Sequence, residues 1–245
     1  MMYAKRCLVF LTMCALALVA CGPVDGNNGN NGGTNNGGGN NGGDVTEVPG
    51  GTLSEDTTWS GTVILTGNIT VESTLTIEPC TTVRVDSRFT LGEGGVLLAQ
   101  GTEDCPITFT SIEDSPSPGD WRWINIGPNA GEGSVFEWVE VEYTGDANEY
   151  AIQLSDKTVT MNNVTIRDGI GTGIRFEDEN SGSSLDNLTF ENMTGYVMVA
   201  EWDNLAQIGS VTATGGELDR IELPGTGLDA PLTMDNKGVP YQNRA

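Results

Sequence analysis

The chain has 245 residues, of which 34 are acidic, 11 are basic and none is histidine, giving a formal net charge of −23 at pH 7. A surface of this charge repels nucleic acid and anionic lipid headgroups, so we predict no nucleic-acid partner. The lack of histidine and of any dense cysteine cluster argues against a zinc site.

The first elements form a leader segment. Lys5 and Arg6 precede 14 uncharged, mostly apolar residues, 7–20. This stretch is too short to span a bilayer comfortably and is typical of a secretory signal peptide. It ends in the sequence Leu18-Val-Ala-Cys21. An ordinary signal peptide with an incidental cysteine is the alternative interpretation.

The end of the leader resembles the lipobox of bacterial lipoproteins, with Leu18 and Ala20 at the aliphatic and small positions of that motif. The resemblance implies that residues 1–20 are removed and that acyl chains on Cys21 hold the protein to a membrane. In that family an Asp after the cysteine favours retention at the inner membrane. Here the position is Gly22, so the resemblance implies the outer membrane or the cell surface.

A low-complexity segment follows the leader. Residues 26–43 consist of Gly and Asn with one Thr, and because they cannot bury apolar surface we expect them to be disordered. We therefore expect a lipidated cysteine and linker at 21–48 and a folded domain at 49–225. Residues 226–245 do not follow the repeat pattern of the folded domain. We expect them to form either an irregular tail or the start of a truncated repeat that opens at Gly238-Val-Pro-Tyr241.

Short runs rich in β-branched residues, broken by Gly, Asn, Asp and Pro, fill the folded part and predict an all-β fold. A sandwich or barrel and a parallel β-solenoid are the competing classes. Periodicity favours the solenoid, because apolar positions recur in separate registers every 22 to 25 residues. The registers are Phe136/Met161/Leu185/Ile208, Val139/Val164/Leu188/Val211 and Ile152/Ile174/Val197/Ile221, with earlier steps from Leu75 to Leu97 and from Val83 to Ile107.

This period predicts about seven coils between Val63 and Leu223. Asn163 and Asn187 precede inward-facing strands, and we expect them at bends because Asn tolerates left-handed backbone and bonds to its own chain. Trp138 occupies the equivalent position one coil earlier, which is a local departure.

Several runs resemble the right-handed parallel β-helix of pectin lyase-like proteins, and in particular repeat proteins of bacterial cell surfaces. They are Leu75-Thr-Ile-Glu-Pro79, the segment 101–111 (GTEDCPITFTS) and Gly119-Asp-Trp121. The resemblance covers roughly residues 50–225. It implies a right-handed, single-stranded parallel β-helix and says little about function, because this fold hosts unrelated activities.

Cys7 and Cys14 lie in the leader, and Cys21 is assigned to lipid. Cys80 and Cys105 are the cysteines that remain. Their separation of 25 residues is one coil, and adjacent coils lie about 4.8 Å apart, within reach of a disulfide. We predict a Cys80–Cys105 bridge; two free thiols in stacked positions are the alternative.

Candidate ligand sites are weaker. Glu177, Asp178 and Glu179 could hold calcium, the one ion that the sequence leaves open, although a solvated acidic loop is the simpler interpretation. We expect no other cofactor. Arg167 and Arg175 beside acidic residues are the one basic–acidic constellation on the regular coils that could serve catalysis, but surface ion pairs of small worth are the simpler explanation.

Trp121 and Trp123 form the candidate glycan-binding site. Strand alternation places Ile124 and Ile126 on one side and the two tryptophans on the other, outside the core. Covering of both indoles by the long loop 112–120 is the alternative.

The sequence as a whole predicts a lipid-anchored envelope β-helix protein with a non-catalytic adhesive, scaffolding or glycan-contacting role. Its expected partners are the membrane, through Cys21, and a polysaccharide or another envelope protein. The alternative is a polysaccharide lyase or glycoside hydrolase displayed on the surface.

Overall fold

The computed structural model describes residues 45–177, 182–224 and 235–244. Within these ranges the chain forms 20 β-strands and one short 3-10 helix, η1 (Trp202–Gln207). The strands belong to two sheets, and every pairing between named strands is parallel.

One sheet contains 11 of the described strands and the other contains nine. The members of the eleven-stranded sheet are β1 (Val45–Val48), β3 (Thr57–Trp59), β4 (Thr62–Leu65), β6 (Thr74–Ile77), β7 (Thr82–Val85), β9 (Val96–Gln100), β10 (Ile107–Ser111), β12 (Ser134–Glu142), β14 (Val159–Arg167), β16 (Ser184–Glu191) and β18 (Val211–Thr214). The members of the nine-stranded sheet are β2 (Gly51–Leu53), β5 (Ile69–Val71), β8 (Arg88–Leu91), β11 (Trp123–Ile126), β13 (Gly145–Ser155), β15 (Ile170–Glu177), β17 (Tyr196–Val199), β19 (Leu218–Pro224) and β20 (Tyr241–Arg244).

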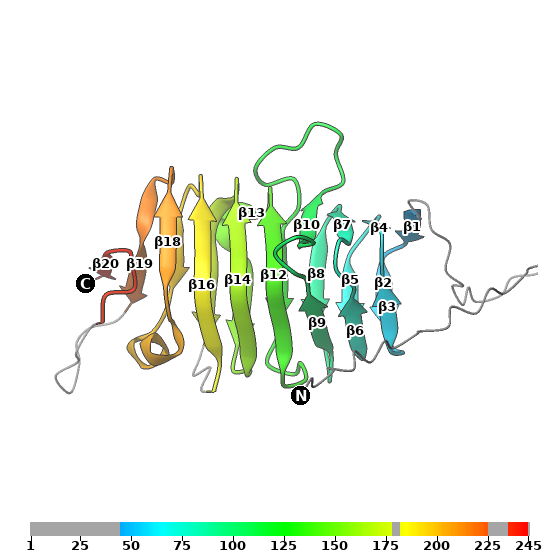
Figure 1. Ribbon diagram of the computed structural model, residues 1–245, viewed down its shortest axis with the longest axis horizontal. Coiled ribbons are helices and arrows are strands. Elements are labelled where there is room, and N and C mark those ends of the chain that lie inside the picture. The colour runs from blue at the N-terminus through cyan, green and yellow to red at the C-terminus, as the bar shows by residue number, and fades with distance from the viewer. Residues whose placement is uncertain (1–44, 178–181, 225–234, 245) are drawn as a thin grey trace, which may run out of the picture. The chain divides into compact units, whose positions relative to one another are not determined.

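The chain alternates between the two sheets and returns each time one coil further along the axis, so that strands distant in sequence lie side by side (Figure 1). This winding is a parallel β-helix, as predicted. A sandwich or up-and-down barrel is excluded, because those folds join neighbouring strands through antiparallel pairs.

The long strands of the eleven-stranded sheet arise by fusion of two short ones. β12 pairs with β9 through Val135–Glu137 and with β10 through Val139–Val141, and the bend between these two halves is Trp138. Trp138, Asn163 and Asn187 all have left-handed backbone, with φ of 50°, 54° and 51°. The predicted Asn bends are confirmed, and Trp138 is their equivalent on β12.

The core consists of axial stacks of apolar side chains between the sheets. Phe136, Met161 and Leu185 are neighbours in register, as are Val139, Val164 and Leu188, and all six are at most 1% exposed. Ile208 and Val211 continue the two stacks. Both predicted registers of this sheet are confirmed.

Three predicted steps were wrong, one that ended at Ile107 and the two that met at Val197. Val83 lies beside Phe109 rather than Ile107, because the additional loop from Gly101 to Pro106 shifts the register by two residues. In the nine-stranded sheet, Ile174 lies beside Met198 rather than Val197. The pairing of β17 with β19 shifts register next to this position, so spacing alone could not locate the inward residue.

The strands begin earlier than predicted at the N-terminal end, and near the other end they agree with the predicted start of a further repeat. Strand β1 starts at Val45, inside the range assigned to the linker, and pairs with β4. Near the other end, β20 adds a rung to β19 and Val239 is 7% exposed, so residues 235–244 continue the solenoid. The predicted signal peptide, Cys21 and most of the linker lie outside the described residues.

The predicted disulfide is present. Cys80 and Cys105 are bonded, with 4.6 Å between their Cα atoms, and the backbone N–H of Cys80 donates to the carbonyl oxygen of Cys105. The bond fastens the loop 101–106 to the coil below it. Gly101 is required there, because a Cβ at this position would lie 2.6 Å from the carbonyl oxygen of Trp138.

In the described part of the chain, no helix is both long enough and apolar enough to cross a bilayer.

Truncating a stacked core side chain should be costly. Leu188→Ala removes a side chain that is 1% exposed between the Val164 and Val211 rungs, and we expect unfolding in urea to show a loss of about 2–5 kcal/mol. Thr160→Ala on the exposed side of β14 is the matched control and should change stability by less than about 0.5 kcal/mol. Equal effects of the two substitutions would contradict the assignment of the core.

Removing the disulfide should also destabilise the domain. The bond closes a loop with a sequence separation of 25, so we expect Cys80→Ala/Cys105→Ala to lose about 3 kcal/mol of unfolding free energy. Peptide mapping without reductant should recover the two cysteine peptides linked. Full alkylation of both thiols in the unreduced protein would refute the pairing.

Candidate functional site

Trp123 is at the centre of an aromatic and cationic cluster on the outer face of the nine-stranded sheet. Its indole is half-buried, and the guanidinium carbons of Arg88 and Arg122 lie 4.8 and 5.4 Å from the ring centroid. The Tyr150 ring lies 5.8 Å from it at an interplanar angle of 44°. Cation–π contacts therefore hold both arginines, whose N–H edges can still donate hydrogen bonds to a ligand.

The other predicted tryptophan is not available to a ligand. Trp121 is 1% exposed and its Nε1 donates to the carbonyl oxygen of Glu142 at 2.7 Å. The prediction of a glycan-binding Trp121 was wrong. Strand β11 begins only at Trp123, so alternation along a strand does not fix the direction of Trp121.

A cavity of about 660 Å³ lies beside this cluster, and we call it the Tyr150 cavity. Tyr150 and Tyr196 line it from different coils, and Gly171 and Gly195 lie between them. Gly195 cannot be replaced without a shift, because a Cβ there would lie 2.4 Å from the carbonyl oxygen of Gly171. The cavity thus combines aromatic side chains with open backbone from closely approaching coils.

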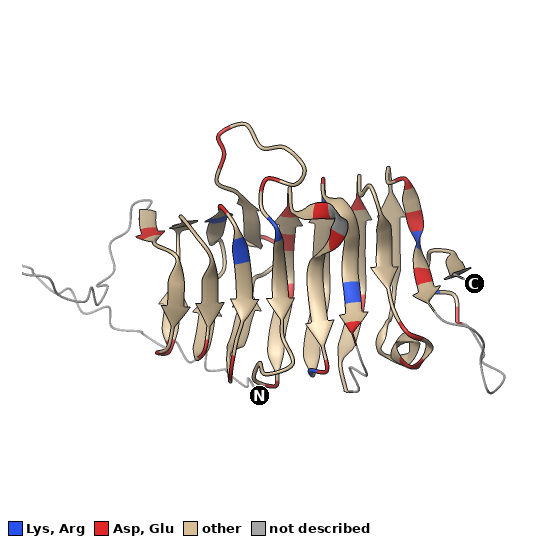
Figure 2. Ribbon diagram, turned by 180° about the vertical axis from the view of Figure 1, so that it is seen from behind, with Lys and Arg blue, Asp and Glu red and all other residues tan. Residues whose placement is uncertain are grey.

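Charged groups surround the Tyr150 cavity. Its lining includes four glutamates and one arginine, namely Glu149, Glu201, Glu217, Glu222 and Arg175. Seen from the side opposite to Figure 1, Figure 2 shows Asp and Glu outnumbering Lys and Arg over the coils. Burial, with Glu149 and Glu177 nearby, raises the pKa of Tyr150, so its hydroxyl stays protonated and donates to Gln153 Oε1.

The arginine–acid constellation predicted from the sequence does not form. Arg167 lies on the eleven-stranded sheet, where it contacts Glu140 at 2.9 Å and also pairs with Glu142. Arg175 lies on the nine-stranded sheet and pairs with Glu177 at 3.4 Å. The two guanidiniums therefore serve separate surface ion pairs.

The calcium prediction stays a prediction. Asp178 and Glu179 lie outside the described residues, and Glu177 is engaged by Arg175. Among the residues that the structure describes, no group of three or more His, Cys, Asp or Glu side chains could hold a metal ion.

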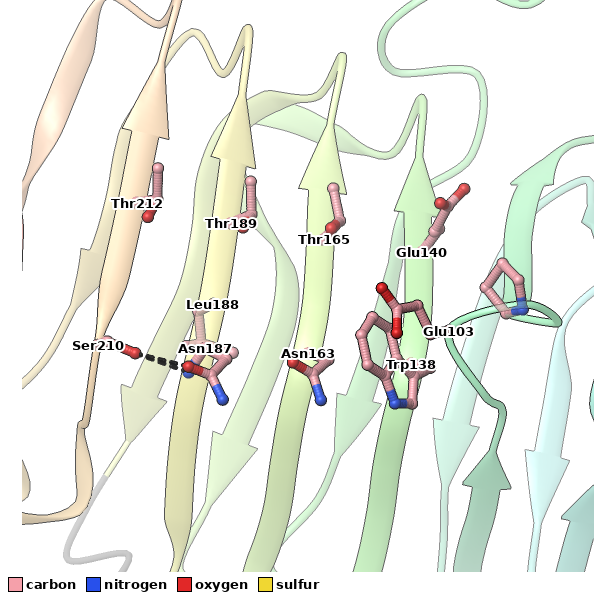
Figure 3. A pocket seen from close by; sticks show the side chains of 11 residues that line it. Glu103, Trp138, Glu140, Asn163, Thr165, Asn187, Leu188, Thr189, Ser210 and Thr212 are labelled. Atoms are coloured by element: carbon pink, nitrogen blue, oxygen red, sulfur yellow. Dashed lines mark hydrogen bonds between the residues drawn. The ribbon is translucent and has the colours of Figure 1, made fainter.

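A second cavity, of about 370 Å³, lies on the outer face of the eleven-stranded sheet, and we call it the Trp138 groove. Figure 3 shows Trp138, Glu103 and Glu140 at one end of the groove and Asn163 and Asn187 further along. Glu103 belongs to the loop that the disulfide fastens, so the covalent bond also holds one wall of the groove.

Hydrogen bonds between rungs order the far end of this groove. Ser210 donates from Oγ to Asn187 Oδ1 at 3.0 Å and to Asp186 Oδ1 at 2.7 Å. The backbone N–H groups of Ser210 and Asn187 also donate to Asp186 Oδ1. These bonds, led by the one from the Ser210 backbone, lower the pKa of Asp186.

Sequence analysis missed several of these residues. Tyr150 and Tyr196 were not predicted, because the strand pairing shifts register next to each of them and the sequence then does not show which residues face outward. Trp138 was noted only as a departure from the row of Asn residues. That departure was the signal in the sequence that could have marked Trp138 as a candidate site residue.

Comparison with known proteins adds nothing to this geometry: no family model, curated protein or solved structure matches the chain.

The bonds to Asp186 predict a pH-dependent contribution to stability. Because the folded pKa of Asp186 is lowered, the contribution is present above the pKa of the unfolded chain and is lost as pH falls through the folded value. Wild type should exceed Asp186→Asn in unfolding free energy at neutral pH, and the difference should shrink below about pH 4. Urea unfolding across this range measures it; a constant difference would contradict the assignment.

Proposed function

We propose that this protein is a non-catalytic, glycan-contacting protein of the bacterial envelope, lipid-anchored through Cys21. The observation that carries the binding role is the set of aromatic side chains beside the Tyr150 cavity. Tyr150 and Tyr196 line it from different coils, and Trp123 contacts Tyr150 from a third coil.

The chemistry of this surface suits a saccharide. Sugar rings present flat C–H faces, which pack on aromatic rings, and hydroxyl edges, which need donors and acceptors nearby. Tyr150 and Tyr196 offer the rings, and the guanidinium of Arg175 and the carboxylates of Glu149 and Glu201 line the same cavity. Because parallel strands carry these groups, their spacing is fixed before a ligand binds, which reduces the entropy cost of binding.

The location rests on the leader. The sequence Leu18-Val-Ala-Cys21 supports lipidation, and Gly22 supports export to the outer membrane or the cell surface. The segment 26–43, rich in Gly and Asn, would let the domain reach a polysaccharide or another envelope protein.

The alternative function is a glycoside hydrolase or polysaccharide lyase. The four glutamates of the Tyr150 cavity favour it, because glycoside hydrolysis commonly uses two carboxylates as acid and base or nucleophile. The separation of Arg167 from Arg175 removes the basic–acidic constellation that would have supported a lyase.

The glycan prediction is tested on a glycan array with the full-length protein in mild detergent. We expect selective retention by a class of polysaccharide and at least a tenfold loss of affinity in Tyr150→Ala and in Tyr196→Ala, which remove one ring each. Thr58→Ala, on the coil that carries β3, is the control and should bind normally. Release of reducing ends or unsaturated products from a bound glycan would replace the binding role with the enzymatic one. No retention on any glycan would contradict both the binding function and the enzymatic function.

The anchor prediction is tested by fractionation. Cys21→Ser removes the acylated thiol, so the protein should move from the membrane pellet to the soluble fraction, while Cys14→Ser in the leader should leave it in the pellet. A Cys21→Ser protein that still sediments after a carbonate wash would contradict the lipoprotein assignment.

A further inference from the structure

Two rows of outward-facing residues run along the eleven-stranded sheet, and the residue type changes on β12 in both of them. The first row is Trp138, Asn163, Asn187 and Ser210, which the flanking pairs bring into register. From β4 to β18 the second row contains six threonines and one glutamate, in the order Thr62, Thr82, Thr108, Glu140, Thr165, Thr189 and Thr212, and on β1 the same position is Val45. Strand β12 therefore replaces an amide with an indole and a hydroxyl with a carboxylate.

Both replacements line the Trp138 groove, together with Glu103 from the disulfide-fastened loop. An indole in left-handed backbone, with φ of 50°, is unfavourable compared with the Asn that the neighbouring coils use. The neighbouring coils thus supply the comparison: β14 and β16 carry Asn and Thr at the positions where β12 carries Trp138 and Glu140, next to Glu103.

The charged side chains that line the groove are hydrogen-bond acceptors. The side-chain nitrogen of Asn163 donates to Glu137 Oε1 at 3.2 Å, and that of Asn187 donates to Asn162 Oδ1 at 2.8 Å, so each amide uses one N–H group within the ladder. The lining contains two carboxylates and neither Lys nor Arg. Arg167 contacts Glu140 from outside the lining, but it is shared with Glu142, so one pair of carboxylates faces one guanidinium.

We propose that the Trp138 groove binds an alkylammonium group. The cation would lie against the face of the Trp138 indole and donate hydrogen bonds to Glu103 and Glu140, a combination that recognises organic cations. A free polyamine and a lysine side chain of an envelope polypeptide share this chemistry. The site lies on the sheet opposite to the Tyr150 cavity and does not depend on glycan binding.

The test is calorimetric titration of the full-length protein, at 150 mM NaCl in mild detergent, with two probes. One probe is spermidine and the other is a blocked peptide, acetyl-Gly-Lys-Gly-Lys-Gly-amide. The matched neutral probe is the same peptide with both lysine amines acetylated. We expect saturable binding of at least one amine and none of the acetylated peptide; the amine that binds identifies the source of the cation.

Two variants restore the residues of the neighbouring rungs and so should fold. Trp138→Asn should weaken binding at least tenfold, and Glu140→Thr should weaken it several-fold. Glu103→Gln tests the loop wall without touching either ladder. The control is Glu93→Gln, an exposed carboxylate in a bend outside the groove, which should leave the affinity unchanged.

Any one of the following results would overturn the proposal. They are an absence of saturable binding for both amines, equal binding of the acetylated peptide, and an unchanged affinity in Trp138→Asn. A loss of affinity in Glu93→Gln equal to that in Glu140→Thr would also overturn it, because it would show only diffuse attraction to an acidic protein.

Discussion

The in-register parallel pairing of each coil with the next is the constraint on which this structure depends. A strand that is paired on both sides, as β14 is with β12 and β16, hydrogen-bonds through its backbone N–H and C=O groups to the coils before and after it. Equivalent residues of successive coils therefore lie above one another. One coil cannot bury its apolar face alone, and the core exists only because Met161, Leu185 and their equivalents form continuous stacks.

The same constraint fixes the chemistry of the surface. Because one coil lies directly on another, an outward-facing residue repeats as a row, and regular rows of Asn or Thr stabilise the bends and strands. A side chain of different chemistry can enter such a surface by interrupting a row, as Trp138 and Glu140 do on β12. Irregular pairing, as between Gly145 and Tyr150, is the second way, because it changes which side chains face outward.

Each of the two sheets carries a different cavity. On the nine-stranded sheet, rings from different coils surround the larger cavity, with glutamates and Arg175 at its borders. On the eleven-stranded sheet, the disulfide between Cys80 and Cys105 holds a loop against Trp138 and closes a smaller, acceptor-rich groove. Some of the described acidic side chains serve local ion pairs, as Glu140 and Glu142 do with Arg167.

The amino-acid sequence by itself determined the fold class, because a period of 22 to 25 residues in separate apolar registers is a property of the chain that only stacked coils satisfy. It also determined the disulfide, since Cys80 and Cys105 are one coil apart, and the bends at Asn163 and Asn187, whose chemistry is local. The tertiary structure alone decided where the period slips, as at Val83 and Val197, because the length of a loop and a shift in pairing are set by contacts between coils. For the same reason it decided that Trp121 is buried and that Glu103, from the loop of one coil, lines a groove with Trp138 and Glu140 of the next: proximity across coils depends on register, which no single run of residues carries.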